Sequence, residues 1–345
     1  MTLSRIRSSA LHRLPRRGGF SLVDLLISLF LGAILSWTTV EVYLASVRSY
    51  LLKVEMANIQ NNGRYALAVL RRELMQVGFL GGASTVSQLQ PKAVSRDCVS
   101  SGVWALDIAV PMDFVNDFDI TGVGSFSTAA GTELSCLTAA DVAIGTDILS
   151  IKRTAGDYTV RNGSYADKAS ARNMQWYLRL HNDEAAAQWI FHSAGGFSAG
   201  DLGANSGIDY WQYRVGIYYI RRYSEAASDQ IPSLCAERLG GGSSAGVMAT
   251  QCLAEGVEDM QFEFGVDSDG DGVSNYFSEA LSGNELSNVV AVRVFLLLRS
   301  LAELSARTGA RTFYLGSKQV SSSDGYVRRV MSTTVRTTNL FVARG

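Results

Sequence analysis

Alternating acidic residues in a short glycine-containing stretch could bind a hard cation. Counted from residue 267, side-chain oxygens fall at positions 1, 3, 5 and 9, and a glycine falls at position 6. This spacing matches the front of an EF-hand-type loop, in which calcium takes six to eight oxygen ligands. Position 12, usually glutamate, is Ser278, and an acidic residue follows one position later. The sequence predicts a candidate calcium site at Asp267, Asp269, Asp271, Asn275 and Glu279. The alternative is an acidic turn after a strand.

The four cysteines form a second set with possible chemistry. They are Cys98, Cys136, Cys235 and Cys252, and no two are at the Cys-x-x-Cys spacing of a metal site. An even number of cysteines in an exported domain predicts disulfides. Chain order favours Cys98–Cys136 and Cys235–Cys252, although four cysteines permit three connectivities.

Signals of catalysis are weak. Residues 196–200 match Gly-x-Ser-x-Gly, but a nucleophile elbow must lead into a helix, and residues 201–207 have the composition of a loop. His181 and His192 lie near aromatic residues and are interpreted as ordinary surface or strand residues. Trp176, Trp189 and Trp211 could form a binding face, although a β-domain core is the stronger interpretation. We therefore predict no catalytic residues and no enzymatic activity.

The balance of charge argues against general binding to nucleic acid. The chain carries 31 Lys and Arg against 32 Asp and Glu, a net charge of −1. Binding to phosphate backbones needs clustered basic residues. Removal of residues 1–19, which hold five arginines and no acid, would give −1 − 5 = −6.

An apolar segment near the N-terminus predicts a membrane helix. Residues 20–40 contain one charged side chain, Asp24, and their length suffices to cross a bilayer as a helix. The arginines before them favour a cytoplasmic N-terminus. A secretory signal would place its small residues after the apolar core, whereas Gly18 and Gly19 precede it. A plain signal anchor remains an alternative, and a carboxylate in a membrane segment is costly and usually functional.

The helix is predicted to continue beyond the membrane, over residues 20–78. Apolar residues recur at helical spacing in two groups, and glycines at 78, 81 and 82 end the pattern. Polar residues and Gly63 between the groups predict a bend or a looser stretch. The two groups are Leu44, Val47, Leu51 and Val54, and then Leu67, Leu70, Leu74 and Val77.

The remainder, residues 83–345, alternates short apolar runs with Gly, Ser, Asn and Asp. This predicts a β-rich domain, so the fold class is α+β, with a long N-terminal helix packed on a large antiparallel β-rich domain. The glycine- and serine-rich loop at 240–247 is a candidate boundary between two lobes. The expected strands are 103–110, 147–153, 188–192, 215–223, 261–266, 289–299 and 326–337.

The N-terminus resembles the processing site of type IV pilins and type II secretion pseudopilins. Residues 16–26 read Arg-Arg-Gly-Gly-Phe-Ser-Leu-Val-Asp-Leu-Leu. The resemblance implies a cytoplasmic leader, 1–19, that a prepilin peptidase cuts between Gly19 and Phe20, followed by N-methylation of Phe20. It also implies that Asp24, where most members carry glutamate, neutralises the N-terminal amine of a neighbouring subunit during assembly. A tolerated polar residue near the headgroups is the alternative for Asp24.

Further residues resemble the PilW branch of minor pilins. They lie at 62–67, 72–74, 78–79, 256–267 and 289–299. The resemblance implies a minor pilin at the inner membrane, with its C-terminal domain in the periplasm and later at the pilus tip on the cell surface. Its partners would be other minor pilins, the major pilin, a tip adhesin, the prepilin peptidase and the inner-membrane assembly platform. It would promote pilus assembly, and hence adhesion and twitching motility. The alternatives are a minor pseudopilin of a type II secretion system and a membrane-anchored, calcium-stabilised adhesion or binding domain.

Overall fold

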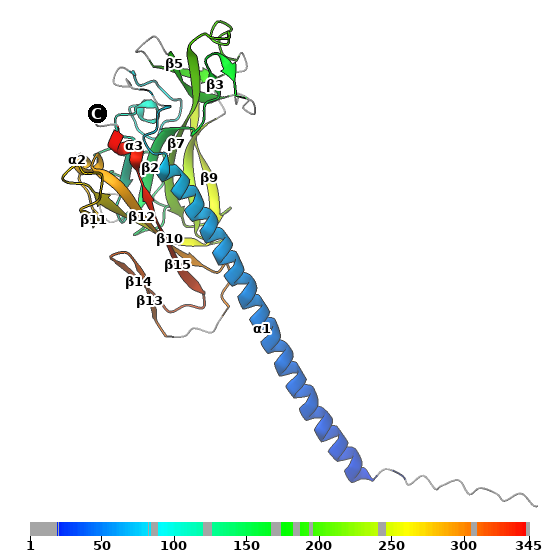
Figure 1. Cartoon of the computed structure of the whole chain (residues 1–345). Coiled ribbons are helices and arrows are strands. Elements are labelled where there is room, and N and C mark those ends of the chain that lie inside the picture. The colour runs from blue at the N-terminus through cyan, green and yellow to red at the C-terminus, as the bar shows by residue number, and fades with distance from the viewer. Residues whose placement is uncertain are drawn as a thin grey trace, which may run out of the picture. The chain divides into compact units, whose positions relative to one another are not determined.

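A computed structural model describes residues 19, 21–81, 83, 89–119, 126–166, 174–181, 187–192, 196–240, 246–304 and 309–342. Internal contacts divide the chain into two compact units, Met1–Lys53 and Val54–Gly345. Helix α1, Leu22–Met75, begins in the first unit and ends in the second. The fold class is α+β, as the sequence predicts: a long helix and a large antiparallel β-rich domain (Figure 1).

In the first unit, α1 presents apolar side chains on all sides. Leu22, Leu29, Phe30, Leu35 and Trp37 are each more than half exposed. This helix is long and apolar enough to cross a membrane. Because exposed side chains of this kind are stable in lipid but not in water, the segment is a candidate membrane anchor.

In the second unit, one stripe of α1 is buried against the sheets. Its members are Ile59, Gly63, Ala66, Val69, Leu70, Glu73 and Leu74. A Cβ atom at Gly63 would lie 2.4 Å from Sδ of Met331 and 3.0 Å from Leu298. Gly63 therefore allows the helix to approach the sheet closely. The helix is continuous through this residue.

The larger sheet has nine antiparallel strands. Its path runs β1 (Met112–Val115), β2 (Ile148–Thr154), β7 (Ile208–Arg221), β3 (Val160–Arg161) and β4 (Ser164–Tyr165). Strand β7 also pairs with β5 (Gln175–His181) and β8 (Ser233–Gly240). Strand β6 (Gln188–His192) pairs with β5, and β9 (Val247–Glu255) pairs with β8. The 14 residues of β7 thus connect most of the sheet.

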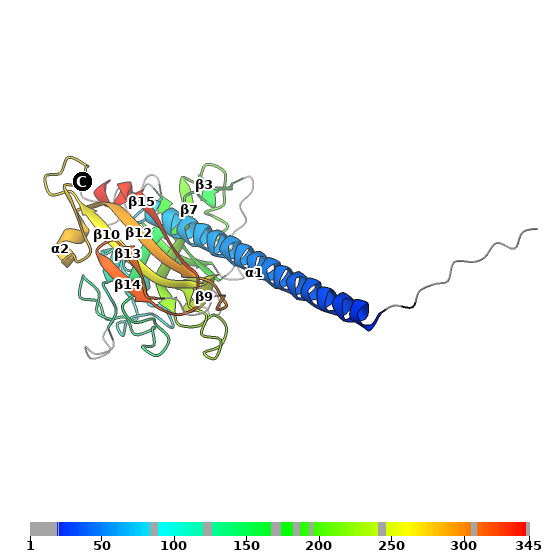
Figure 2. The ribbon, with the colours of Figure 1, turned by 90° about the horizontal axis from the view of Figure 1, so that it is seen from below.

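The second sheet has four antiparallel strands in the order β11, β10, β12, β15 (Figure 2). They are Tyr276–Ser278, Val257–Val266, Val289–Arg299 and Arg328–Arg336. A separate hairpin joins β13 (Arg311–Leu315) to β14 (Lys318–Ser322). Short helical segments are η1 (Trp104–Leu106), α2 (Gly283–Leu286) and α3 (Thr338–Val342).

The main hydrophobic core lies where α1 meets both sheets. It combines Leu70 and Leu74 of α1 with Leu149 of β2, Phe262 of β10 and Val294 of β12. A second cluster, which includes Trp189 and Tyr213, packs on residues 89–142. Trp176 and Trp189 are buried there, so they belong to the core rather than to a binding face.

Most predicted strands are present, and one prediction needs correction. Strands β6 and β12 have the predicted bounds, and β2, β7, β10 and β15 overlap their predicted ranges. The predicted strand 103–110 is wrong, because its first part is the helical turn η1. The carboxylate of Asp97 accepts hydrogen bonds from the backbone N–H groups of Trp104, at 2.6 Å, and Ala105, at 3.2 Å. These bonds satisfy donors that would otherwise require a neighbouring strand.

The candidate lobe boundary at 240–247 lies between β8 and β9. These two strands pair with each other from Ser233↔Glu255 to Gly240↔Val247. Both belong to the same compact unit. Residues 241–245 lie outside the described residues, but the strands on either side form one antiparallel hairpin within the large sheet.

Candidate functional site

Asp24 lies in the first turn of α1 and takes part in a reciprocal cap. The backbone N–H of Ser21 donates to Oδ2 of Asp24, at 3.3 Å, and the N–H of Val23 donates to Oγ of Ser21, at 3.4 Å. This arrangement resembles a capping box with aspartate at the third helical position, but Oγ of Ser21 accepts from the second helical residue instead of the third. A carboxylate there also interacts favourably with the positive end of the helix dipole. Gly19 is exposed, and Phe20 and the leader up to residue 18 lie outside the described residues.

The cap gives Asp24 a local role besides the predicted role in assembly. Its carboxylate stabilises the start of the helix within its own chain. A capping role requires a hydrogen-bond acceptor, whereas pairing with the amine of a neighbouring subunit requires a negative charge. Substitutions that separate these two properties can therefore distinguish the two roles.

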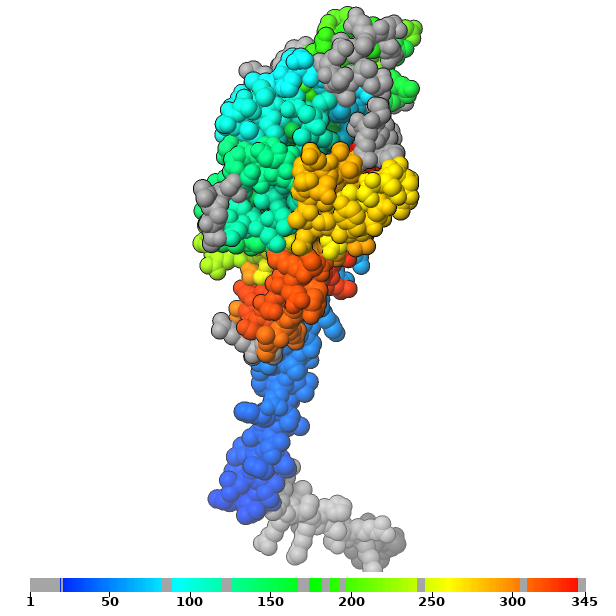
Figure 3. Space-filling model, turned by 90° about the vertical axis from the view of Figure 1, so that its left-hand side faces the viewer, coloured from blue at the N-terminus to red at the C-terminus, as the bar shows by residue number. Residues whose placement is uncertain are grey.

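The acidic loop after β10 brings three of the predicted ligands together. One carboxylate oxygen from each of Asp267, Asp269 and Asp271 lies within 4.8 Å of the others. Asp267 is buried, the other two are exposed, and the segment lies at the surface (yellow, Figure 3). Gly270 and Gly272 have φ values of 82° and 83°, which only glycine adopts readily. These glycines turn the chain so that the three carboxylates converge.

Backbone donors hold Asp267 in its ionised form. Its Oδ1 accepts from the N–H of Gly270, at 2.6 Å, and its Oδ2 accepts from the N–H of Gly272, at 2.9 Å. Burial raises the pKa of Asp267, but these hydrogen bonds outweigh burial and the pKa is lower than usual. Carboxylates that lie this close together repel one another, and a bound cation would relieve this repulsion.

Asn275 and Glu279 have other partners. Oδ1 of Asn275 accepts from the backbone N–H of Ser268, at 2.7 Å, and from its hydroxyl, at 3.0 Å. The side-chain amide of Asn275 donates to Asp269, at 3.2 Å. Glu279 accepts a hydrogen bond from Ser317, in the turn between β13 and β14. The calcium prediction therefore depends on the three aspartates, with Asn275 adjacent and Glu279 in contact with a different element.

We expect calcium to raise the melting temperature of the full chain in detergent, and Asp269→Ala to remove the effect. A cation that binds only the folded state adds about 2.7 kcal/mol at a hundredfold excess over Kd. Few strong ligands converge, so millimolar-class affinity is expected. Calorimetric titration and thermal melting measure both quantities. Magnesium is the control ion, and Asp157→Ala, at an exposed residue outside the loop, is the control variant. If the wild type melts at the same temperature with and without calcium, the calcium prediction is wrong and the loop is an acidic turn.

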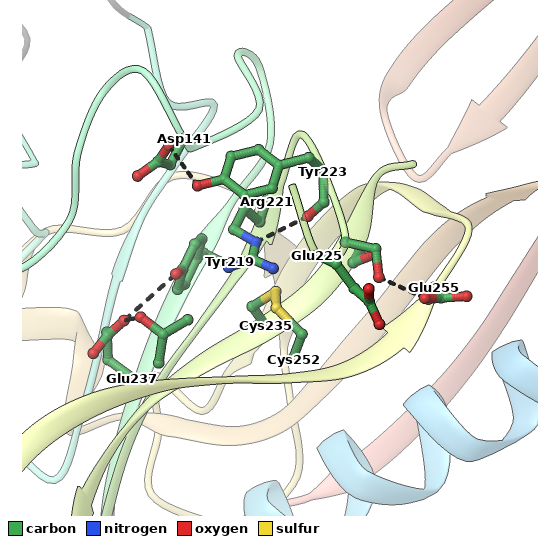
Figure 4. The surroundings of a disulfide bond; sticks show 12 residues. Asp141, Tyr219, Arg221, Tyr223, Glu225, Cys235, Glu237, Cys252 and Glu255 are labelled. Atoms are coloured by element: carbon green, nitrogen blue, oxygen red, sulfur yellow. Dashed lines mark hydrogen bonds between the residues drawn. A yellow bond between two sulfur atoms is a disulfide. The ribbon is translucent and has the colours of Figure 1, made fainter. Parts of the chain in front are cut away.

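Both disulfides predicted from chain order are present, Cys98–Cys136 and Cys235–Cys252. Cys235 and Cys252 are direct neighbours across β8 and β9 (Figure 4). The bond closes a loop with a sequence separation of 17, a length for which constraint of the unfolded chain contributes about 3 kcal/mol.

Polar contacts surround the second disulfide. Tyr223 donates from its hydroxyl to Asp141, at 3.0 Å, and Ser224 donates to Glu255, at 2.5 Å (Figure 4). Nε of Arg221 donates to the carbonyl of Tyr223, at 2.9 Å. These bonds connect the end of β7 to β9 and to the loop at residue 141. The disulfide and its neighbours therefore stabilise one edge of the sheet.

A buried ion pair between α1 and β2 has no signature in the sequence. Nε of Arg153 lies 2.6 Å from Oε2 of Glu73, and the two side chains are 1% and 7% exposed. Burial raises the pKa of Glu73, but Arg153 outweighs burial and lowers the pKa below its usual value of 4.5. The partners are 80 residues apart, so only the fold shows that they meet.

The Gly-x-Ser-x-Gly segment does not have the geometry of a nucleophile elbow. Residues 196–207 form turns and bends, with no helix among them. Phe197 is buried and stacks on Tyr210 at a centroid distance of 3.9 Å. His192, in β6, is buried against Phe197, and His181 ends β5. The segment thus contributes an aromatic residue to a small core.

Comparisons with curated proteins and with solved structures found no match. A family model does match residues 217–339, a little over one third of the chain. The matched region runs from within β7 to the beginning of α3, and it includes both β-domain segments that resemble the PilW branch. The model is that of type IV pilus-assembly protein W, and the match supports a protein involved in type IV pilus assembly.

Proposed function

We propose that this protein is a minor pilin that joins a priming complex at the pilus tip and promotes assembly of the type IV pilus. The observation that carries the proposal is the pilus-assembly family match in a β-rich unit whose chain begins with an exposed apolar helix. Such a helix can anchor the subunit in the membrane before assembly and can then pack among the helices of a fibre. Adhesion and twitching motility would follow from the pilus that it helps to build.

Processing and topology belong to the same proposal. Cleavage between Gly19 and Phe20 would leave Asp24 in the first helical turn, close to the new N-terminus. The arginine-rich leader favours a cytoplasmic N-terminus, with the β-rich unit in the periplasm. Two disulfides in the β-rich unit are consistent with that oxidising compartment.

The proposed partners are other minor pilins, the major pilin, a tip adhesin, the prepilin peptidase and the inner-membrane assembly platform. The family match supports interaction with components of pilus assembly. A pseudopilin of a type II secretion system would share the apolar helix. A membrane-anchored adhesion domain stabilised by calcium would share the acidic loop, but would not need cleavage.

We expect Asp24→Ala to reduce surface pili strongly when the variant replaces the native gene at native expression. The charge that would neutralise a neighbouring amine is lost, and an unpaired charge in lipid costs several kilocalories per mole, about 2.5–3.5 kcal/mol on insertion scales. Counting pili by electron microscopy and measuring twitching zones test this. Deletion of the whole gene sets the lower limit.

Asp24→Asn and Asp24→Glu separate capping from charge. Asparagine keeps an oxygen that can accept from the backbone N–H of Ser21 but carries no charge, so Asp24→Asn should reduce surface pili as strongly as Asp24→Ala. Glutamate keeps the charge and should support wild-type piliation. Normal piliation with asparagine would show that the side chain acts only as a cap, and normal piliation after gene deletion would refute the proposed function.

A further inference from the structure

An arginine-lined groove lies in the second unit, beside the C-terminal end of α1. Its volume is about 720 Å³. Arg72 of α1, Arg214 of β7 and Arg238 of β8 line it, and Glu73 is the one acidic residue among its described lining residues. Two strands and one helix thus place three guanidinium groups around one concave surface, which we call the arginine groove.

The single carboxylate in the arginine groove is already neutralised. Glu73 forms the buried ion pair with Arg153, at 2.6 Å, and lies 3.7 Å from Nη2 of Arg72. Arg238 and Arg72 also contribute to the low pKa of Glu73, which indicates that their charges act on the same site. Three guanidinium groups, those of Arg72, Arg153 and Arg238, therefore act on one carboxylate. Arg214 adds a further positive charge to the lining, so the groove has an excess of positive charge.

Arg153 provides a second, independent observation. It is 1% exposed, and its Nε and Nη1 donate to Glu73 and to the carbonyl of Thr154. Its Nη2 is buried and has no hydrogen-bond partner among the described residues. Arg153 lies directly opposite Arg214 in the register of β2 and β7, so both side chains leave the same face of the sheet.

The rest of the lining suits an extended polypeptide better than a nucleic acid. Gln175, Gln212 and Gln251 supply side-chain amides. The amide oxygens of Gln212 and Gln251 accept from Arg214, at 3.1 Å, and from Arg238, at 3.0 Å, and the amide nitrogens can donate to main-chain carbonyls. Thr250 and Gln251 belong to β9, which pairs only with β8 among the described strands. The one aromatic lining residue, Tyr218, is buried, so the described lining offers no exposed ring on which bases could stack.

We propose that the arginine groove binds an extended acidic segment of a protein partner, whose carboxylates pair with Arg72, Arg214 and Arg238. Guanidinium groups form paired hydrogen bonds with carboxylates. The backbone N–H of Met248 donates to the carbonyl of Arg96, at 3.0 Å. Beyond Met248, the edge of β9 offers a strand beside which the segment can lie. The proposal goes beyond pilus assembly and does not depend on it.

The test measures binding of a fluorescent oligoglutamate peptide to the purified full chain in detergent, by fluorescence anisotropy at low and physiological ionic strength. We expect salt-sensitive binding to the wild type and none with oligoglutamine. The double variant Arg214→Gln/Arg238→Gln should weaken binding about tenfold or more, since each charge-assisted contact is worth about 1.5–3 kcal/mol and about 1.4 kcal/mol corresponds to tenfold. Arg72→Gln, on the exposed helix surface, should weaken it less and provides a second variant with little risk to folding.

The matched control is Arg311→Gln/Arg329→Gln, which changes the net charge equally at two exposed strand residues outside the groove. Retained binding in this control, together with loss in the groove variants at unchanged melting temperature, supports the proposal. Equal weakening in both double variants would show attraction by net charge alone and would overturn it. Tighter binding of an oligonucleotide of equal charge, through the same arginines, would assign the groove to nucleic acid and overturn the proposal. Absence of oligoglutamate binding to the wild type would also refute it.

Discussion

Replacing Glu73 by alanine is expected to lower the free energy of unfolding by about 3–5 kcal/mol, because the change leaves the Arg153 charge buried and uncompensated. Arg153 is 1% exposed and one of its donor groups already lacks a partner among the described residues. A loss of this size is a large fraction of the about 5–15 kcal/mol that stabilises a typical domain. Urea unfolding followed by tryptophan fluorescence measures it, since four of the five tryptophans lie after residue 53.

Arg72→Ala is the matched control for this prediction. It removes a guanidinium that is 58% exposed and 3.7 Å from the same carboxylate. Exposed ion pairs contribute about 0–1 kcal/mol, so Arg72→Ala should change stability by less than about 1 kcal/mol. Equal losses of unfolding free energy in Glu73→Ala and Arg72→Ala would contradict the prediction. They would show that the contact with the exposed Arg72, and not the buried charge of Arg153, accounts for the loss.

The same ion pair predicts how stability depends on pH. The folded-state pKa of Glu73 lies below its usual value of 4.5. A depressed acidic pKa contributes stability above the unfolded pKa, and this contribution is lost as pH falls through the lower folded pKa. The wild type should therefore lose stability below about pH 4.5 more steeply than Glu73→Gln, whose side chain does not titrate.

Helices and strands with a clear local pattern of apolar residues could be predicted from the sequence. Strand β12, Val289–Arg299, is an apolar run interrupted only by Arg293 before its last residue, and this run predicts the strand. The apolar residues of β10 alternate, and Met260, Phe262 and Phe264 all lie in the main core. The long helix follows from its apolar segment and from the repeated spacing after it.

Elements that depend on distant partners could not be predicted in this way. Strands β8 and β9 have mixed polar and apolar residues, and their stability comes from β7 and from the disulfide between Cys235 and Cys252. The turn η1 depends on Asp97, whose carboxylate binds donors seven and eight residues away. Neither an amphipathic pattern nor a propensity encodes such contacts.

The candidate sites also differ in whether nearby or distant residues form them. The three aspartates of the acidic loop lie within five residues of one another, and local turn geometry is enough to bring them together. The arginine groove draws its guanidinium groups from α1, β7 and β8, so it exists only once the sheet and the helix have packed. Arg72 and Glu73 are adjacent in the sequence, yet one is exposed and the other is buried. Helical spacing places Glu73 on the buried stripe with Leu70, but only the fold shows that Arg153 lies beside it.

We expect Gly19→Arg to abolish processing of the N-terminus and, with it, surface pili. In the proposed mechanism the peptidase must reach the backbone just before an α-helix, and a residue without a side chain leaves that bond accessible. A Cβ atom at Gly19 would meet no described atom within 4 Å. The substitution should therefore leave the fold intact, so that a defect would come from the cleavage step.

Mass spectrometry of the protein purified from its native host gives the readout. The wild type should begin at a methylated Phe20, whereas Gly19→Arg should retain the leader and accumulate in the membrane fraction. Gly18→Ala is the matched control, since it adds a methyl group one residue earlier and should still be cut. A wild-type chain that begins at any other residue would contradict cleavage between Gly19 and Phe20. A wild-type chain that keeps the whole leader would leave the apolar segment of α1 as a permanent membrane anchor, because a helix with this arginine-rich leader cannot leave the bilayer to enter a fibre.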